Sequence, residues 1–259
     1  MALDAFDVAG RVAVITGGGT GIGRATALLF AEAGAPVVLA SRKAANLEKV
    51  AAEVRERGGT ALVVPTDVRD PDQCRALVDR TIAEHGRVDV LVNNAGGSHS
   101  YPLESWTVEA WENMLALNLR SVFLLSQAAA GHMVEHGSGA IVNVSSGASQ
   151  LGLPYVAPYG AAKAGVNNLT KTLAGALTPK GVRVNCVAVG AVASEGFVRE
   201  MQRIGRDPDE VGGMSNAVGR AGRPEEIAYP ILFLASDAAS FLSGETIYVG
   251  GGPHVPPML

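Results

Sequence analysis

Residues 11–33 read RVAVITGGGTGIGRATALLFAEA, and this stretch decides the fold. An apolar run at Val12–Thr16 is followed by glycines and then by an amphipathic helical pattern over Gly21–Ala33. Glycines between a strand and a helix let the backbone turn sharply and approach a pyrophosphate, which the positive end of the helix dipole attracts. The stretch therefore predicts a dinucleotide site that includes Gly17, Thr20, Gly21 and Ile22.

Strand and helix patterns continue to alternate along the chain. The other predicted strands are Pro36–Ser41, Ala61–Thr66, Val88–Asn93, Ala140–Ser145, Arg183–Val189 and Thr246–Val249. The other predicted helices are Ala44–Arg57, Pro71–His85, Thr107–His136, Tyr155–Leu177 and Pro224–Ala235. Right-handed crossovers between such units produce an α/β fold, a doubly wound (Rossmann) parallel seven-stranded sheet with helices on both faces. Because composition changes nowhere, we expect a single domain over residues 1–259.

Residues 191–222 do not follow this alternation. The segment contains scattered glycines, Pro208 and apolar side chains such as Phe197 and Met201. It is too long for an ordinary connection, and it follows the carboxyl end of a predicted strand, where open α/β sheets bind ligands. We predict a substrate lid here.

Composition and charge exclude several classes of protein. The 259 residues are 47% hydrophobic and 18% charged, which excludes intrinsic disorder. The formal net charge is −4, and no basic stripe is present for nucleic acid. No apolar run reaches the ~20 residues of a membrane span. Cys74 and Cys186 lie far apart without metal-binding spacing, so we expect a reducing, cytoplasmic location.

The end of the second predicted strand indicates which dinucleotide binds. A carboxylate there would accept hydrogen bonds from the ribose 2′-hydroxyl and repel a 2′-phosphate. This chain has Ser41 and Arg42 instead, and a guanidinium suits a phosphate. We therefore predict NADP(H), with NAD(H) less favoured. The alternative is that Arg42 and Lys43 are only solvated charges that precede the next helix.

Several motifs resemble the short-chain dehydrogenase/reductase family in order and spacing, across nearly the whole chain. They are TGGGTGIG (16–23), Asp67-Val68, Asn93-Asn94-Ala95-Gly96, Asn118, Ser146 and YGAAK (159–163). The branches most similar are the 3-oxoacyl reductase-like and 2,4-dienoyl-CoA reductase-like enzymes. The resemblance implies that Asp67 and Val68 contact the adenine and that further cofactor contacts come from Asn94, Ala95, Gly96, Val192 and Ser194. It also implies a homotetramer built through the helices at 107–136 and 155–177.

The chain departs from the family pattern at the end of the sixth strand. The family has Pro-Gly where this chain has Val189-Gly190, and a threonine where it has Ser194. Serine keeps the hydroxyl. The loss of proline removes a fixed φ angle beside the nicotinamide.

Tyr159 and Lys163 lie four residues apart at the start of a predicted helix, so they project from one face. A nearby ammonium favours phenolate, and we expect it to lower the tyrosine pKa toward neutrality. The resemblance makes Tyr159 the general acid/base and gives Lys163 a contact with the nicotinamide ribose. It assigns Ser146 to polarising the carbonyl oxygen and Asn118 to holding a relay water. The neighbouring Ser145 is expected only to end its strand.

His132, Glu135 and His136 match the H-x-x-E-H pattern of some zinc peptidases. Because no further ligand follows and the motif precedes Gly137, we interpret it as the end of a helix and expect no metal.

Substrate identity is less constrained by the sequence. Leu151, Leu153, Tyr155, Phe197 and Met201 favour an apolar lining. We therefore expect a hydrophobic ketone and its secondary alcohol, such as a 3-oxoacyl thioester or a steroid. An enoyl- or dienoyl-CoA reductase is the enzymatic alternative, and a non-catalytic dinucleotide sensor or scaffold is the other.

Overall fold

The computed structural model describes residues 3–252, and these form one seven-stranded, fully parallel sheet in the order β3-β2-β1-β4-β5-β6-β7. The predicted Rossmann fold is confirmed. The strands are β1 (Ala13–Thr16), β2 (Val37–Ser41), β3 (Ala61–Pro65), β4 (Val90–Asn93), β5 (Gly139–Ser146), β6 (Val182–Val189) and β7 (Thr246–Val249). Strand order reverses between β1 and β4, and ligands of such sheets bind at this switch point.

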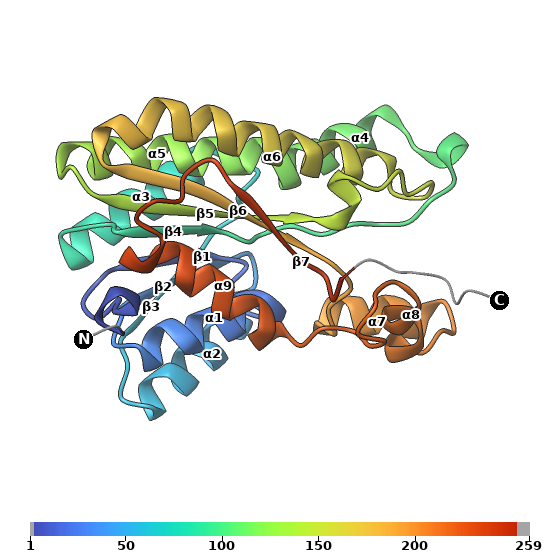
Figure 1. Ribbon diagram of the computed structural model, residues 1–259, viewed down its shortest axis with the longest axis horizontal. Coiled ribbons are helices and arrows are strands. Elements are labelled where there is room, and N and C mark those ends of the chain that lie inside the picture. Colours follow the sequence, from blue (N-terminus) through green and yellow to red (C-terminus); the bar gives the residue numbers. More distant parts are fainter. Residues whose placement is uncertain (1–2, 253–259) are drawn as a thin grey trace.

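Helices cover both faces of the sheet (Figure 1). On one face lie α1 (Gly21–Glu32), α2 (Ala44–Glu56) and α9 (Pro224–Ala235). On the other lie α3 (Pro71–His85), α4 (Val108–Leu115), α5 (Ser121–Glu135) and α6 (Ala157–Leu177). Local sequence sets their ends: Asp70 caps the first turn of α3, and Gly86, with a φ of 74°, terminates it.

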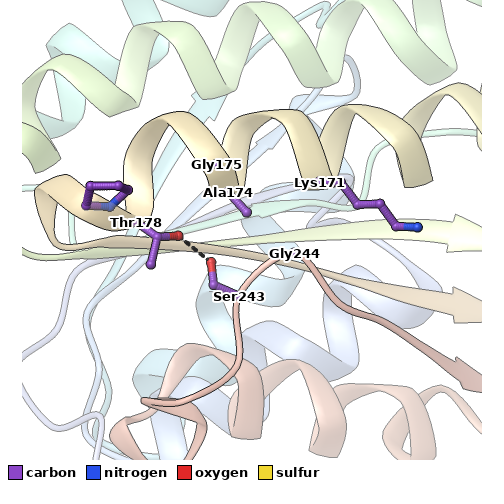
Figure 2. Close-up of a pocket in the computed structure, with 7 residues that line it drawn as sticks. Lys171, Ala174, Gly175, Thr178, Ser243 and Gly244 are labelled. Carbon is purple, nitrogen blue, oxygen red and sulfur yellow. Dashed lines mark hydrogen bonds between the residues drawn. The ribbon is translucent and has the colours of Figure 1, made fainter.

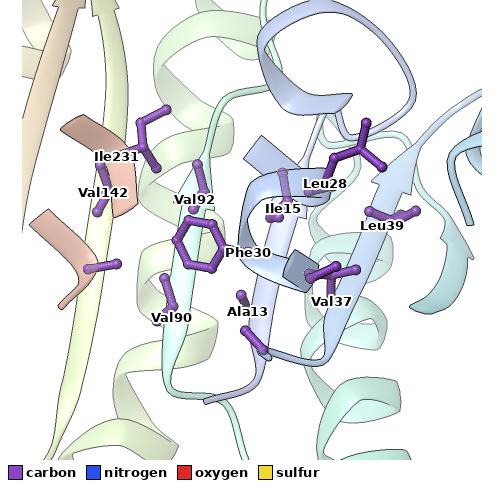
Figure 3. Close-up of a cluster of buried hydrophobic side chains, with 14 of the residues drawn as sticks. Ala13, Ile15, Leu28, Phe30, Val37, Leu39, Val90, Val92, Val142 and Ile231 are labelled. Atoms are coloured by element: carbon purple, nitrogen blue, oxygen red, sulfur yellow. The ribbon is translucent and has the colours of Figure 1, made fainter. Parts of the chain in front are cut away.

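The largest buried cluster lies between the sheet and the layer of α1 and α9 (Figure 3). Phe30 of α1 is fully buried there, among Ile15, Val37 and Val92 from three adjacent strands. Burying one such side chain contributes about 2–3 kcal/mol. This packing fixes α1, and with it the glycine loop, against the sheet.

Two predicted elements differ from the structure. The single helix expected over Thr107–His136 contains a π-helical turn at Ala116–Arg120, between α4 and α5. The predicted lid contains two short helices, α7 (Glu195–Arg203) and α8 (Pro208–Met214), where we expected a loop. Its ends are joined by a β-bridge between Val192 and Gly222. Caps at Ser194 and Asp207 explain both lid helices.

The continuous helical stretch Val108–Glu135 is long and apolar enough, by length and composition, to cross a membrane. In this fold, however, α5 packs against α3, α6 and the sheet. Part of its apolar surface is therefore buried by packing within the fold.

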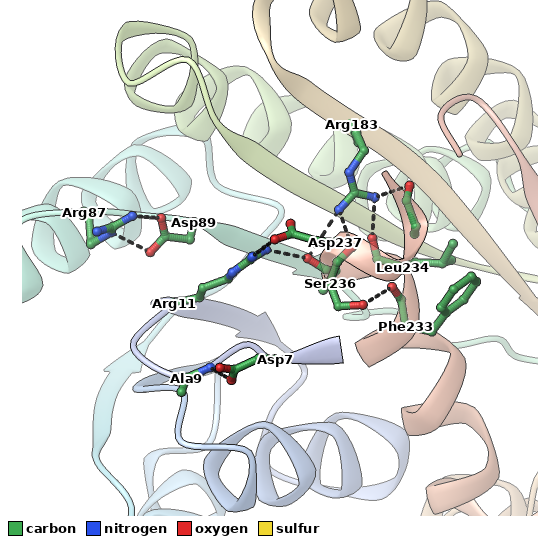
Figure 4. A network of polar contacts seen from close by, with 12 residues as sticks. Asp7, Ala9, Arg11, Arg87, Asp89, Arg183, Phe233, Leu234, Ser236 and Asp237 are labelled. Carbon is green, nitrogen blue, oxygen red and sulfur yellow. Dashed lines mark hydrogen bonds and ion pairs between the residues drawn. The ribbon is translucent and has the colours of Figure 1, made fainter. Parts of the chain in front are cut away.

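Arginines brace the amino ends of the strands (Figure 4). Arg183 donates hydrogen bonds to the carbonyl oxygens of Leu234 (2.7 Å) and Ser236 (2.9 Å) at the end of α9. Arg87 pairs with Asp89, whose carboxylate also accepts from the backbone N–H of Val12. These contacts tie α9, β1 and β4 together at the edge opposite the carboxyl ends.

Candidate active site

The glycine loop follows β1 at the carboxyl edge of the sheet. Gly17 and Gly21 have positive φ angles of 68° and 53°. A Cβ on Gly23 would lie 2.2 Å from the carbonyl oxygen of Gly17, so only glycine fits there. Thr20 precedes α1 without a side-chain cap, which leaves the first N–H groups of the helix for a ligand. This cradle fits a pyrophosphate.

The loops after β1 and β4 are joined across the switch point. The side chain of Asn94 donates to the carbonyl oxygen of Thr16 at 2.8 Å. The backbone N–H groups of Asn94 and Ala95 each donate to the Thr16 hydroxyl at 3.0 Å. A Cβ on Gly96 would lie 3.3 Å from Nζ of Lys163. The second cofactor segment therefore runs from the glycine loop directly to the predicted catalytic lysine.

Ser41, Arg42 and Asp67 gather beside the glycine loop, where β2 and β3 end. Arg42 is exposed, and within residues 3–252 its guanidinium forms no ion pair. Hydrogen bonds from Arg69 lower the pKa of the Asp67 carboxyl to about 2, with a smaller contribution from Arg42. The Asp67 carboxylate is therefore ionised and held by Arg69, while Val68 is buried. Their adenine contacts remain predictions.

Tyr159 and Lys163 lie on the first turns of α6, with Nζ of Lys163 5.7 Å from the centroid of the tyrosine ring. Lys163 is only 3% exposed, and its ammonium donates to the carbonyl oxygen of Val144 at 2.8 Å. Burial lowers the pKa of Lys163 to about 8. The predicted juxtaposition of the phenol and the amine is present.

The predicted effect on the tyrosine pKa is wrong for this structure. Burial raises the pKa of Tyr159 above its usual value, and a hydrogen bond with Ser146 only partly opposes that shift. The Lys163 ammonium is directed to Val144 and is itself desolvated, so it does not offset the burial. The phenol is protonated at neutral pH, as an ordinary tyrosine is, and burial makes it a weaker acid than an exposed phenol.

Two adjacent serines of β5 have different roles in the structure. Ser145 is buried and its hydroxyl donates to the backbone carbonyl of Lys163 at 3.0 Å. Ser146 ends β5, contacts Tyr159, and its hydroxyl accepts from the N–H of Ala148 at 3.2 Å. Ser145 therefore does more than end its strand, because it joins β5 to α6.

Asn118 is fully buried in the π-helical turn. Its side chain donates to the carbonyl oxygen of Gly97 at 3.0 Å and accepts from the N–H of the same residue at 3.1 Å. It also donates to the carbonyl oxygen of Met114, which the π turn frees from regular helical bonding. Asn118 thus holds the loop after β4 in position by hydrogen bonds. Its predicted role with a relay water stays a prediction.

The start of the lid lies on the glycine loop. A Cβ on Gly21 would meet the Cβ of Ser194 at 3.0 Å and a carboxylate oxygen of Glu195 at 3.4 Å. Val192 is buried at the bridge to Gly222. Ser194 therefore lies beside the glycine loop, and the cofactor contacts of Val192 and Ser194 remain predictions.

A buried polar network was missed in the sequence. Asn93 donates to Ser126 (3.1 Å) and to Asn143 (2.9 Å), and Asn143 donates to Thr170 (2.9 Å). It links β4, α5, β5 and α6 directly beneath the catalytic residues. An asparagine within the apolar run of β5 was the signal that could have indicated it.

Two other features lie outside this site. A hollow of about 470 Å³ borders the carboxyl half of α6 (Figure 2) and is lined by Lys171, Ala174, Gly175, Thr178, Pro179, Ser243 and Gly244. Twelve residues, about 18 Å of helix, separate Tyr159 from Lys171. At the end of α5, the rings of His132 and His136 stack 4.1 Å apart.

Comparisons with known proteins agree with this geometry. Residues 17–254 match the sequence model of a family described as enoyl-(acyl carrier protein) reductase. The chain is 45% identical to cis-4-hydroxycyclohexanecarboxylate dehydrogenase of Sinomonas cyclohexanicum, covering 93% of this chain and 96% of the relative. It is 37% identical to a 3-oxoacyl-[acyl-carrier-protein] reductase of Thermotoga maritima, covering 94% and 97%.

Solved structures are similar over the same extent. A 7α-hydroxysteroid dehydrogenase complexed with NADH and a 7-oxo bile acid superposes with a TM-score of 0.90, at 34% identity over 96% of each chain. A structure assigned as an NAD(P)-dependent gluconate 5-dehydrogenase of Beutenbergia cavernae, with bound NADP, has a TM-score of 0.89 and 38% identity, covering 95% and 98%. The chain belongs to the short-chain dehydrogenase/reductase family, whose members compared here act on hydroxyl and keto groups.

Proposed function

We propose that this protein interconverts a hydrophobic ketone and its secondary alcohol, for example a 3-oxoacyl thioester or a steroid, with NADP(H). The observation that carries the proposal is the convergence of Ser146, Tyr159 and Lys163 where β5 ends and α6 begins. A sensor of the dinucleotide would need the glycine loop but no buried proton donor.

Each side chain has a defined task in the reduction. When bound, a reduced nicotinamide supplies the hydride that reaches the carbonyl carbon. Ser146 donates a hydrogen bond to the carbonyl oxygen and stabilises the charge that develops there. Tyr159, whose phenol is protonated at neutral pH, gives its proton to that oxygen and completes the alcohol. Lys163 provides a nearby ammonium as the phenol becomes anionic.

The preference for NADP(H) rests on Ser41 and Arg42. Neither is acidic, and the exposed guanidinium of Arg42 beside Asp67 suits a 2′-phosphate. The relatives include one complex with NADH and one with NADP, so the family alone does not decide the cofactor.

Reduction of a carbon–carbon double bond is the second candidate. The family model that the chain matches is described as an enoyl reductase, which favours it. The proximity of Ser146 to Tyr159 supports carbonyl chemistry, because two neighbouring hydroxyl groups can donate to a single carbonyl oxygen.

Assembly and location belong to the same proposal. We expect a cytoplasmic homotetramer formed through α4, α5 and α6, and the exposed apolar side chains Val108, Trp111 and Phe123 on these helices support burial between copies. Sedimentation equilibrium of the purified protein measures the number of copies, and a monomer would contradict the expectation.

A substrate panel tests the activity. NADPH oxidation is followed at one protein concentration with ketones, enones and acyl thioesters, and NADH is tested in parallel. We expect turnover of ketones and a preference for NADPH. Turnover confined to enones would establish the second candidate, and dinucleotide binding without any turnover would establish a sensor.

A further inference from the structure

The loop at residues 97–106 begins in space beside the predicted catalytic residue Lys163 and extends to the start of α6. It begins at Gly97, which Asn118 holds by two hydrogen bonds, one residue after the close approach of Gly96 to Lys163. Farther along, the N–H of Tyr101 donates to the carbonyl oxygen of Tyr155 at 3.0 Å. Tyr155 lies two residues before α6, whose first turn carries Tyr159, so this loop lies beside the start of that helix.

Aromatic rings gather on this loop. Tyr101 and Trp106 pack edge to face, with ring centroids 5.2 Å apart, and the indole N–H donates to the carbonyl oxygen of Tyr101 at 3.2 Å. The ring of His99 lies 6.2 Å from that of Tyr101. We call His99, Tyr101, Trp106 and Tyr155 the aromatic wall. Tyr101 and Tyr155 are 46% and 58% exposed, so the wall presents ring surface to a ligand.

Helix α7 of the lid carries Glu200 and Arg203, whose charges interact weakly with His99 and Tyr101 of the aromatic wall. Glu200 and Arg203 pair with each other at 2.7 Å, so their charges cancel locally. An exposed carboxylate–guanidinium pair is a weak anchor for a further anion.

The segments that border the substrate side of the site carry more acidic than basic side chains. Residues 97–114 contain Glu104, Glu109 and Glu112 and no lysine or arginine, residues 147–158 carry no charge, and residues 193–222 have a net charge of −1. These three segments together carry −4, which is the formal net charge of the whole chain. These segments, which border the predicted substrate side of the site, therefore carry a net negative charge.

We propose, on the basis of the function proposed above, that the substrate is a free, ring-bearing secondary alcohol or ketone. A rigid alicyclic or aromatic ring packs on the aromatic wall with little loss of conformational freedom. Thioesters of coenzyme A or of an acidic carrier protein are disfavoured, because their phosphates or carboxylates meet like charge at the approach.

Kinetics with matched ketones test this assignment. We expect kcat/KM with NADPH to be at least ~10-fold higher for 4-methylcyclohexanone than for 2-heptanone, which has the same number of carbons, and acetoacetyl-CoA to be the poorest substrate. Tyr101→Ala should remove most of the ring preference, because kcat/KM should fall more for 4-methylcyclohexanone than for 2-heptanone. Tyr229→Ala, an exposed tyrosine on α9, is the matched control and should change neither value. A preference for acetoacetyl-CoA would overturn the assignment and leave the oxidoreductase function intact.

Binding gives a second, independent readout. Trp106 and Trp111 are the only tryptophans of the chain, so in a Trp111→Phe protein the emission comes from the wall itself. Titration with 4-methylcyclohexanol in the presence of NADP⁺ should change this emission saturably, and Tyr101→Ala should weaken the affinity. Saturable binding without turnover of any panel member would retain the ring site and overturn the proposed catalysis. Absence of both signals would overturn both proposals.

Discussion

The ammonium of Lys163 donates a 2.8 Å hydrogen bond to the carbonyl oxygen of Val144, two residues before Ser146 in β5. The hydroxyl of Ser145 returns a second bond to the backbone of Lys163. These two bonds fix the position of helix α6 along strand β5. The distance between the Tyr159 and Ser146 hydroxyls consequently depends on buried bonds and not on surface loops.

Replacement of Lys163 by methionine should change the pH dependence of stability. Burial lowers the pKa of Lys163 from 10.5 to about 8, so between these values the unfolded chain holds a proton that the folded protein does not. The unfolding free energy of the wild type should therefore rise relative to Lys163→Met, by roughly 2–3 kcal/mol, as pH increases through this window. Urea unfolding of both proteins at about pH 7.5 and about pH 10 measures the difference. A constant difference would show that the lysine is not desolvated in the fold.

Tyr159→Phe should lower kcat for ketone reduction by at least ~10², because the proton donor is lost while the ring is retained. NADPH affinity, measured by the fluorescence of the bound nicotinamide, should stay within about 3-fold. Tyr229→Phe, an exposed tyrosine on α9 outside the site, is the matched control and should keep kcat within about 3-fold. Near-normal turnover by Tyr159→Phe would remove this residue from the mechanism.

The pair Ser41→Asp and Arg42→Ala should shift the ratio of kcat/KM for NADPH over NADH by at least ~10-fold toward NADH. The new carboxylate accepts from the ribose hydroxyls and repels a 2′-phosphate. Lys49→Ala removes a similarly exposed charge from α2 and should leave the ratio unchanged. An unaltered ratio in the double variant would refute the NADP(H) assignment.

Gly23→Ala should abolish dinucleotide binding and destabilise the fold by more than about 2 kcal/mol. Its Cβ would lie 2.2 Å from the carbonyl oxygen of Gly17, and neither backbone segment has room to move without disturbing the loop. Gly131→Ala, in a helix with open space at the β position, should instead be neutral or stabilising by up to about 1 kcal/mol. Thermal unfolding and NADPH titration of the two variants compare these outcomes directly.

Glu226→Gln should weaken the base of the lid in a pH-dependent way. Hydrogen bonds from Arg220 and from the backbone of Arg223 lower the pKa of Glu226 to about 2, from 4.5. The stabilisation is complete above pH 4.5 and is lost as pH falls toward 2. Because the pair is partly exposed, we expect about 1 kcal/mol at pH 6.5, and less at about pH 3. Urea unfolding at both values should show the two proteins converging in acid, and a gap that persists there would contradict the ion-pair explanation.

The layered fold and the candidate site followed from short-range pattern. Parallel strands buried on both faces are continuous apolar runs, so β1, β2, β5 and β6 could be placed to within a residue or two. The glycine loop and the spacing from Tyr159 to Lys163 are local as well, because each depends on one turn of backbone.

What the sequence did not reveal depends on contacts between distant segments. The π turn around Asn118 occurs where its side-chain amide forms hydrogen bonds with Gly97, 21 residues earlier. No periodicity within the helix predicts those bonds. The raised pKa of Tyr159 likewise depends on how completely neighbouring elements bury the ring, and a spacing of four residues carries no information about burial. The lid helices have local caps, but the scattered glycines and Pro208 favoured a loop in the sequence prediction.

The amino ends of the strands are held by Arg11, Arg87 and Arg183, whereas the candidate active site lies at the carboxyl ends. Contacts that stabilise the fold are therefore separated in space from the reacting groups. Substitutions at that end change contacts of α9 and of the first residues of β1 and β4. These contacts lie roughly the full length of a strand away from Tyr159. Heat tolerance can therefore be raised or lowered there by selection or engineering while the rate constants of the reaction are left alone.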